Sequence, residues 1–440
     1  MASTSLSRTN GTATDKKKFT LSIWVKTCAV GAKYLAVVYN DDNNRALFQF
    51  GGSNDIVFQS KYSGSANAAL TTNRLCRDPS GWYHFVLNGD STESVATDRL
   101  KLFVNGVQET SFASDTYPSL NDDFYWGETQ DFYIGQKGDG SDYFNGLMSN
   151  IVFVDGLAYA PTEFGAVDST SGIWKFKPPS GLTYGTNGFW LKGENSGALG
   201  TDSSGNTNTF TTAGSPTQAI DTPSNVLATF NSIDNYWAGS TFSYGNTKVV
   251  TSSLSYAANL STLGVSTGKF YAEFKCTDEG RGYPQVGIKG NSPTAASDGV
   301  SNGADSVCYY GFNGEKLVGG SSSPYGTTYG TGDIIGVAMD LTNNRIFFSK
   351  NNVWQDSGDP TSSTGAITIP TSTSGWYFMG VDDEDNAGTN TWEANFGNGY
   401  FGITQVSSAG TSSTDDDSIW EYDCPTGYYG LNTKNINTYG

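Results

Sequence analysis

Apolar and polar residues alternate with a period of two along much of the chain, beginning at residue 19. In the run FTLSIWV every second residue is apolar, which directs one face of an extended strand toward a core. Similar short runs recur and are separated by clusters of Asn, Asp, Gly and Ser, which form turns. VNGV at 104–107 indicates a tight hairpin, because Asn-Gly tolerates positive φ angles. The pattern predicts an all-β protein of two tandem antiparallel β-sandwiches with very little helix.

The length of the chain favours two domains. A single hydrophobic core stops growing at about 250 to 300 residues, whereas this chain has 440. A stretch rich in Ser, Thr, Gly and Asn, with little apolar periodicity, interrupts the strand pattern near the middle. We therefore expect a first sandwich at residues 1–192, a connector at 193–230, a second sandwich at 231–405 and an aromatic tail at 406–440.

The amino-acid composition supports this architecture and limits the kinds of partner that we expect the protein to bind. Gly 54, Tyr 25, Phe 25 and Trp 10, with 15% charged residues, are typical of short strands and Gly-rich turns. The net charge of -18 repels phosphate backbones, so no nucleic-acid partner is expected. No stretch approaches the length of a membrane span, and the N-terminus lacks an apolar signal region. We expect synthesis in a cytosol, no membrane insertion and no export by a signal peptide.

The inventory of reactive side chains excludes several kinds of catalytic site. The one histidine, His84, lies in the strand-like WYHFVL, where a structural role is expected. A single His cannot form an HExxH metal site, and no GxSxG, phosphate-binding loop or dinucleotide motif is present. Five widely spaced cysteines form no CxxC pair, so neither a disulfide framework nor a zinc site is indicated.

Glycoside hydrolysis needs only two carboxylates, so the histidine count does not exclude it. In sandwich glucanases those acids alternate along one strand, as in Glu-x-Asp-x-Glu, and this chain has no such stretch. The acidic cluster DDEDN at 382–386 follows a strand-like run and is interpreted as a solvated turn. We therefore expect that the protein is not an enzyme.

Aromatic residues near loops are better candidates for function, because sugar rings present apolar faces that stack on Trp and Tyr. The alternative is that each aromatic ring covers its own sandwich edge. Acidic loop residues could supply oxygen ligands to a calcium ion, the one cofactor that the sequence suggests. The stacking candidates are Tyr125, Trp126, Tyr325, Tyr329 and Trp354, and the calcium candidates are Asp122 and Asp123.

The tail ends in an aromatic segment, SIWEYDCPTGYYGLNTKNINTYG. An extended aromatic segment can bury a large area on a partner at low entropic cost. Two alternatives stay open: the tail docks on another protein, or it folds back onto the second sandwich. The residues that would dock are Trp420, Tyr422, Tyr428 and Tyr429.

Two blocks of the sequence resemble known families. TLSIWVK, RDPSGWYHFVLNGD, DRLKLFVNGV, FYIGQ and FNGLMSNIVFVDG, in this order, resemble the concanavalin-like, laminin-G type jelly roll. GKFYAEFKC, GDIIGVAMDLTNNRIFFSKNNVW and WEANFG resemble the SPRY domain. In both folds the inter-strand loops bind ligands and differ between members, so the resemblance implies a fold without transferring ligand residues.

A third resemblance covers the segments before, between and after the two blocks, which we call the joint segments. LSRTNGTATDKKKFTLSIWVK, SGIWKFKPPSGLTYGTNGFWLKGENSGALGTDSSGNTNTF, IDTPSN and CPTGYYGLNTKN are similar to bacteriophage virion proteins. This resemblance implies a fibre or surface-appendage protein located on the virion surface. Its partners would be other virion proteins and a host-surface polysaccharide or protein receptor. It also implies a homo-oligomer, a trimer in the case of a fibre.

Three functional hypotheses follow. The first is a tail fibre or similar appendage that binds host-surface glycan or protein through sandwich loops. The second is a head decoration or cement protein whose domains pack on capsid or tail neighbours. The third, disfavoured by the missing pair of acids, is a glycan-degrading enzyme using Asp122 or Asp123.

Overall fold

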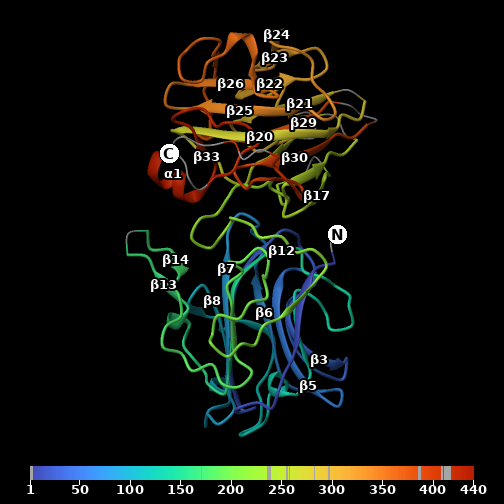
Figure 1. Ribbon diagram of the computed structural model, residues 1–440, viewed down its shortest axis with the longest axis vertical. Coiled ribbons are helices and arrows are strands. Elements are labelled where there is room, and N and C mark those ends of the chain that lie inside the picture. Colours follow the sequence, from blue (N-terminus) through green and yellow to red (C-terminus); the bar gives the residue numbers. More distant parts are fainter. Residues whose placement is uncertain are drawn as a thin grey trace. The chain divides into compact units, whose positions relative to one another are not determined.

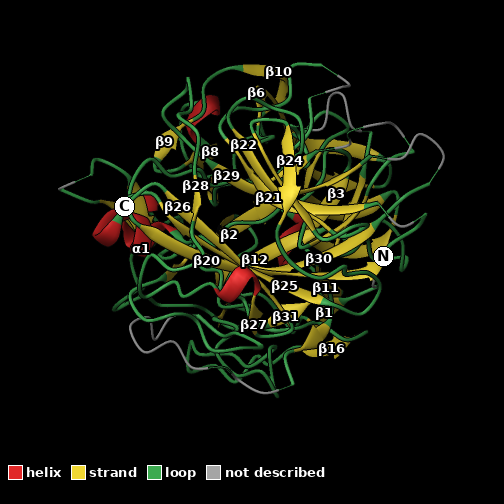
Figure 2. Ribbon diagram, turned by 90° about the horizontal axis from the view of Figure 1, so that it is seen from above, coloured by secondary structure: helices red, strands yellow, loops and turns green. Residues whose placement is uncertain are grey.

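The computed structural model describes residues 3–169, 171–234, 239–253, 256, 258–281, 283–295, 298–384, 388–407, 410 and 418–440. The chain divides into two compact units, Met1–Ala219 and Ile220–Gly440. Strands dominate both units (Figures 1 and 2). The described residues contain one α-helix, α1 (Thr433–Tyr439), and four short 3-10 helices. The predicted all-β fold of antiparallel sandwiches is confirmed.

The first unit contains an eight-stranded and a six-stranded antiparallel sheet (Figure 1). The eight-stranded sheet has the order β10 (Phe112–Thr116), β6 (Ser65–Leu75), β5 (Asp55–Tyr62), β4 (Asn44–Phe50), β3 (Lys33–Asp41), β11 (Asp131–Ile134), β1 (Ser5–Thr9), β16 (Thr211–Ala213). The six-stranded sheet has the order β15 (Phe189–Leu191), β12 (Gly146–Asp155), β2 (Lys18–Thr27), β7 (Tyr83–Asp90), β8 (Leu100–Val104), β9 (Val107–Gln108).

The core of this unit lies between the two sheets and is rich in phenylalanine. The alternation seen in FTLSIWV directs Phe19, Leu21 and Ile23 into it, and each is 2% exposed or less. Phe132 and Phe153, from opposite sheets, meet edge to face at 5.3 Å between ring centroids. The aromatic content of the sequence therefore fills a sandwich core.

The outer face of the six-stranded sheet is covered by the chain that follows β12. A hairpin of β13 (Gly165–Val167) and β14 (Trp174–Phe176) lies there. Trp174 Nε1 donates a hydrogen bond to His84 Nδ1, and Trp24 stacks on the His84 ring at 4.5 Å. His84 is fully buried, which agrees with the structural role expected from its aromatic neighbours.

The first part of the predicted connector belongs to the first sandwich. Phe210 is part of its core, and β16 pairs with β1. The Asp202 carboxylate accepts hydrogen bonds from Trp190 N and Asn208 N, at 2.9 and 2.8 Å. The expected boundary at residue 192 is therefore too early, because polar side chains fix this loop where apolar periodicity is lacking.

In the same region, three short segments of the chain contact one another. Arg8 Nη2 donates to Asn208 Oδ1 at 2.8 Å, and Asn187 accepts from Gly11 N at 2.7 Å. Asn187 Nδ2 in turn donates to Gly11 O at 3.0 Å. The segments RTNG, YGTNG and SSGNTN thus form one seam of side-chain and backbone hydrogen bonds that closes the first unit.

The second unit contains a nine-stranded and a six-stranded sheet. The nine-stranded sheet follows the order β17 (Thr241–Ser243), β18 (Lys248–Val250), β30 (Thr391–Asn395), β20 (Lys269–Asp278), β25 (Ile334–Asp340), β26 (Arg345–Lys350), β27 (Val353–Trp354), with β28 (Ile367–Thr368) on β26 and β33 (Tyr429–Gly430) on β20. The six-stranded sheet has the order β19 (Asn259–Leu260), β29 (Phe378–Asp383), β21 (Pro284–Lys289), β22 (Ser306–Tyr310), β23 (Glu315–Val318), β24 (Ser321–Pro324).

The C-terminal segment is part of this second unit. β33 pairs in parallel with β20, and Thr433 N donates to Val226 O at 2.9 Å. Lys434 N donates to Asn225 Oδ1 at 3.2 Å. The motifs IDTPSN and GLNTKN therefore form a second seam, in which the end of the predicted connector pairs with the end of the chain.

Candidate ligand-binding surfaces

Two of the predicted stacking residues lie in the core of the first unit. The 3-10 turn η2 (Tyr125–Gly127) inserts its side chains between the sheets. Tyr125 is 5% exposed and Trp126 is 1% exposed, and Trp126 stacks on Phe58 and Phe132. The expectation that they offer exposed faces is wrong, because the turn inserts both rings into the sandwich.

The tyrosines predicted in the second unit are also buried. The Tyr329 hydroxyl donates to Tyr309 O at 2.7 Å, and the Tyr325 hydroxyl accepts from Phe348 N at 3.1 Å. Both rings belong to the core, so the expected exposure is wrong for them too. Trp354 is half-buried against the cluster that includes Trp420 and Tyr428.

The acidic candidates do not assemble into a metal site. Asp122 lies in a turn whose amide donates to Ser119 O, and Asp123 O accepts from Asn67 Nδ2 at 2.8 Å. Among the described residues, no three or more His, Cys, Asp or Glu side chains gather as a metal-binding group. Calcium binding at Asp122 and Asp123 therefore stays a prediction without a third acidic ligand beside it in the described chain.

The cluster 382–386 differs from the solvated turn that the sequence suggested. Asp382 and Asp383 are the last residues of β29, and both are buried. Val300 N donates to Asp382 Oδ2 at 2.7 Å, and burial raises the pKa of Asp382 to about 8. The solvated-turn interpretation is wrong for these two residues, and residues 385 and 386 lie outside those described.

The aromatic tail folds back onto its own unit. Trp420 and Tyr428 are fully buried against Tyr271 of β20, and the Trp420 and Tyr271 rings meet at 4.9 Å. Tyr422 and Tyr429 are half-buried. Docking through Trp420 or Tyr428 is therefore a wrong expectation, because their rings already pack on this sheet. The acidic part of the tail, at 411–417, lies outside the described residues.

A buried carboxylate holds this tail in place. Glu273, in the middle of β20, is fully buried and accepts from Glu421 N and Tyr422 N, each at 2.9 Å. Asn395 Nδ2 donates to the same carboxylate at 3.0 Å. Burial raises the pKa of Glu273 to about 7, although these hydrogen bonds favour the charged form.

The outer face of the eight-stranded sheet carries tyrosines that sequence analysis did not single out. Cross-strand pairing aligns Tyr34 with Gln49, and Tyr39 with Arg45. Tyr133 pairs with Val37 in the row between them. Phe48 and Phe50, whose side chains alternate with Gln49, point into the core, so the paired tyrosines point outward. The three tyrosines are half-buried and lie on one face.

Polar groups lie among these tyrosines without being fully paired. Arg45 forms an ion pair with Asp42, and its Nη2 lies 3.4 Å from Gln59 Oε1. Lys137 forms an ion pair with Asp42 at 3.3 Å. Arg45 Nε and Gln49 Oε1 are inaccessible and have no hydrogen-bond partner among the described residues. One unpaired donor and one unpaired acceptor thus lie on the same face as the tyrosines.

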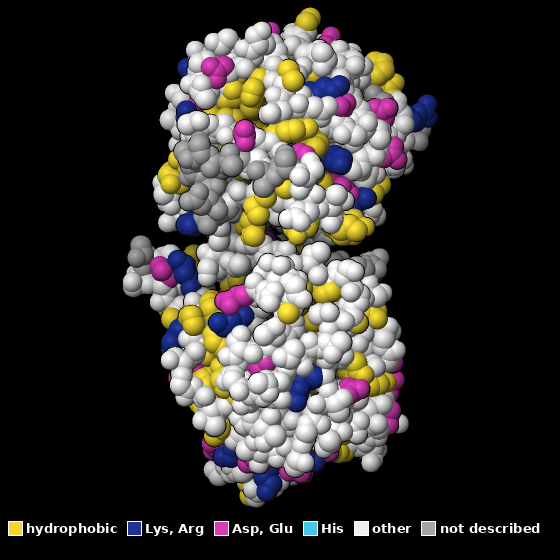
Figure 3. Space-filling model, viewed as in Figure 1, with side chains coloured by type: hydrophobic (Ala, Val, Ile, Leu, Met, Phe, Trp, Pro, Cys, Tyr) yellow, Lys and Arg dark blue, Asp and Glu magenta, His cyan; other side chains and the backbone are white. Residues whose placement is uncertain are grey.

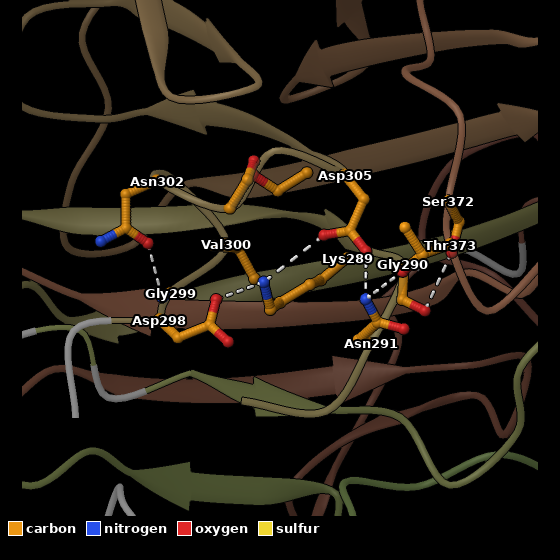
Figure 4. Close-up of polar contacts among 12 residues, drawn as sticks. Lys289, Gly290, Asn291, Asp298, Gly299, Val300, Asn302, Asp305, Ser372 and Thr373 are labelled. Atoms are coloured by element: carbon orange, nitrogen blue, oxygen red, sulfur yellow. Dashed lines mark hydrogen bonds and ion pairs between the residues drawn. The ribbon is translucent and has the colours of Figure 1, made fainter. Parts of the chain in front are cut away.

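A second polar cluster lies at one end of the six-stranded sheet of the second unit (Figure 4). Lys289 is 2% exposed, and its Nζ lies 2.5 Å from Asp298 and 3.6 Å from Asp305. Asn291 Nδ2 donates to Asp305 and to Thr373 Oγ1, at 2.5 and 3.1 Å. Because the ammonium group is enclosed by two carboxylates, this cluster fixes the loop after β21 and offers little to a ligand.

Charged side chains of both signs are interspersed on the face that Figure 3 shows. On the face shown in Figure 3, acidic and basic side chains are scattered over each unit and do not gather in one patch. Within the described part of the chain, no helix has the length and apolar character to cross a membrane.

Comparisons with known proteins agree with the two sandwiches. Residues 2–162 match the Concanavalin A-like lectin/glucanases superfamily, and residues 269–363 match the SPRY domain. The chain carries a concanavalin-like domain and a SPRY domain. The SPRY match lies within the second unit, from the start of β20 to beyond β27.

Relatives of the SPRY domain are much longer proteins. Ran-binding protein 9 from Danio rerio is 36% identical over 88 residues, which cover 19% of this chain and 14% of that protein. Human Ran-binding protein 9 is also 36% identical over 88 residues, which cover 12% of its length. The SPRY domain of human HERC1 is 16% identical, with a TM-score of 0.29, covering 38% of this chain and 96% of that structure.

Proposed function

We propose that this is a non-enzymatic binding protein whose concanavalin-like domain binds a saccharide on the outer face of the eight-stranded sheet. The observation that carries the proposal is the unpaired Arg45 Nε and Gln49 Oε1 beside Tyr34, Tyr39 and Tyr133. A sugar hydroxyl both donates and accepts hydrogen bonds, so it matches this donor and acceptor in chemistry. Because neither atom has accessible surface, the Arg45 and Gln49 side chains would turn outward to meet it. The apolar face of the sugar ring would stack on a tyrosine. A match to a superfamily that includes lectins supports this class of ligand.

The opposite sheet is less suited to this role. Its outer face is covered by the β13–β14 hairpin, which buries Trp24 and His84. Leu47 and Val37 on the eight-stranded sheet are also buried, so the proposed site has an apolar floor between its polar groups. Binding sites for small molecules commonly combine an apolar lining with a few convergent polar groups.

Retention on polysaccharide tests the site. Full-length protein is run by affinity electrophoresis through gels containing bacterial surface polysaccharides, together with Gln49→Leu, Tyr133→Ala and the control Tyr244→Ala. Tyr244 is 40% exposed and lies in the other unit. We expect a polysaccharide that retards the native protein and the control but not the two site variants. Equal retardation of all four proteins would contradict the proposed face.

We further propose that the protein is a surface appendage of a bacteriophage virion. The support is the similarity of the joint segments to phage virion proteins, and these segments form the two seams described above. Immunogold labelling of particles would show whether the protein is on the virion and whether it lies on head or tail. Host cells preincubated with the protein should adsorb fewer phage, and unchanged adsorption would contradict a receptor-binding role.

The alternative of a head decoration or cement protein keeps only the half-buried Tyr422 and Tyr429 among its four suggested docking residues. Trp420 and Tyr428 are buried within the second unit and are not available to a neighbour. A labelled head would nevertheless favour this alternative over an appendage.

A further inference from the structure

Six side chains share the outer face of three neighbouring strands in the SPRY unit. Gln285 of β21 pairs with Asp382 of β29 on one side and with Tyr310 of β22 on the other. The intervening residues Val286, Tyr309 and Val381 point into the core. Three residues just beyond the strand ends, each two positions outward from this row, join it through ring and hydrogen-bond contacts. These are Tyr283, Phe312 and Glu384.

The aromatic members of this set form an exposed platform. The rings of Tyr283 and Phe312 stack at 5.1 Å with an interplanar angle of 27°, and Tyr310 lies 6.0 Å from Phe312. Phe312 is 55% exposed, whereas Tyr310 is 9% exposed. Phe312 is thus a largely exposed ring that two neighbouring aromatic rings hold in place, and its face is available for stacking.

The polar members of the set present acceptors. Gln285 is fully buried; its Nε2 donates to Glu384 Oε2 at 3.0 Å. This contact fixes the orientation of the amide, because the reverse orientation would place two oxygens together. Gln285 Oε1 then has no hydrogen-bond partner among the described residues. A buried acceptor left in this way costs stability unless a donor reaches it.

A carboxylate, that of Glu384, lies beside the platform. Glu384 accepts from Tyr256 at 3.4 Å and from Gln285. Burial and the neighbouring Glu384 carboxylate raise the pKa of Tyr310, so its hydroxyl stays protonated. Glu384 is a negatively charged acceptor, and Gln285 Oε1 is an unpaired acceptor. The ligand that fits them best supplies hydrogen-bond donors and positive charge. A planar guanidinium supplies five donors and stacks on aromatic rings.

We propose that Tyr283, Phe312, Gln285 and Glu384 bind an arginine side chain displayed by a protein partner. The guanidinium would stack on the Phe312 platform and donate to Glu384, whose carboxylate is held in place by the buried Gln285 amide. This site lies in the SPRY unit and is independent of the saccharide face of the other unit. Its chemistry also differs, because the saccharide face offers an unpaired donor and an unpaired acceptor, whereas this site offers acceptors.

Saturation-transfer NMR on the full-length protein tests the proposal, with N-acetyl-arginine methylamide and its citrulline and lysine counterparts as probes. Citrulline keeps the shape of arginine but removes the charge. We expect binding of the arginine probe, and weakening by about tenfold or more for citrulline and for the Phe312→Ala and Glu384→Gln variants. Trp376→Ala, which removes another exposed aromatic ring from the unit, should bind like the native protein.

Several outcomes would overturn the proposal. They are absence of binding to the native protein, equal binding of citrulline, or full binding by Glu384→Gln. Stronger binding of the lysine probe would assign the site to ammonium groups instead.

Arg281, an exposed residue near Tyr283, is replaced by Ala in a further variant. That variant should bind at least as well as the native protein, and loss of binding would contradict the assigned residues. Circular dichroism confirms that each variant is folded.

Discussion

Trp174 Nε1 donates a hydrogen bond to His84 Nδ1 over 2.9 Å, joining two residues 90 positions apart. Because Nδ1 accepts, the proton of the neutral ring is on Nε2, which lies 2.8 Å from Ser22 Oγ and donates to it. This contact fastens the β13–β14 hairpin to the six-stranded sheet. The one histidine of the chain thus has its tautomer set by tertiary structure.

Replacing Trp174 by Phe should destabilise the first unit. The buried Nδ1 would lose its donor, and an unsatisfied buried acceptor costs about 1 to 3 kcal/mol. Urea unfolding followed by far-ultraviolet circular dichroism measures the change. Phe176→Leu, next to the same contact but without a polar group, is the control for lost aromatic packing. Equal losses in the two variants would show that the hydrogen bond contributes little.

The stability of the first unit should fall in mild acid because of His84. Burial lowers the pKa of His84 to about 3, from 6.5. The folded state therefore resists a proton that the unfolded state takes up, so stability is complete above pH 6.5 and declines as the pH falls toward 3. The slope is up to about 1.4 kcal/mol per pH unit. We expect the free energy of unfolding of His84→Gln to change less between pH 7.5 and 5 than that of the native protein. Parallel pH profiles would contradict this.

Glu273 should lower the stability of the second unit as the pH rises, which is the opposite of the pH dependence expected from His84. Its pKa is raised to about 7 from 4.5, so its contribution is complete below pH 4.5 and is lost as the pH rises to 7. Glu273→Gln carries a constant cost, because its amide NH₂ faces a backbone donor. Relative to the native protein, however, the variant should gain stability as the pH rises through this window. Thermal unfolding of both proteins at pH 5 and 7.5 measures the difference, and a constant difference would contradict the prediction.

Lys289 should be much more important for stability than a surface lysine. Lys289→Met would leave the Asp298 and Asp305 carboxylates without their cation, and breaking a buried pair costs about 3 to 5 kcal/mol. Lys101→Met breaks a surface pair with Asp98 and should cost about 1 kcal/mol or less. Chemical unfolding of the two variants gives the comparison. A triple variant that also carries Asp298→Asn and Asp305→Asn should recover part of the loss.

Sequence analysis predicted the fold class and the structural role of His84, but it placed several aromatic residues wrongly. Tyr125 and Trp126 follow an acidic, loop-like stretch, yet a short 3-10 turn inserts both rings between the sheets. Period-two alternation does not extend into such a turn, so it gives no indication of which way the side chains point. Tyr34 was missed because a bulge between Tyr34 and Ala36 shifts the alternation and places its side chain on the same face as Tyr39.

Hydrophobic patterning also failed to predict the boundary between the two units. The predicted connector at 193–230 has little apolar periodicity, yet Phe210 lies in one core and Phe230 in the other. Polar side chains such as Asp202 shape the first part of this segment by accepting backbone hydrogen bonds. Hydrophobic patterning detects strands and is insensitive to segments ordered by polar contacts.

The sequence by itself determined that this chain forms short strands with apolar faces, because alternation is a property of consecutive residues. Only the tertiary structure decided which outer faces remain available, because a face is covered by chain that can be far away in sequence. Trp174 covers His84, and residues 418–440 cover Glu273. The faces around Gln49 and around Gln285, each of which combines unpaired polar atoms with aromatic rings, are those we assign to ligands.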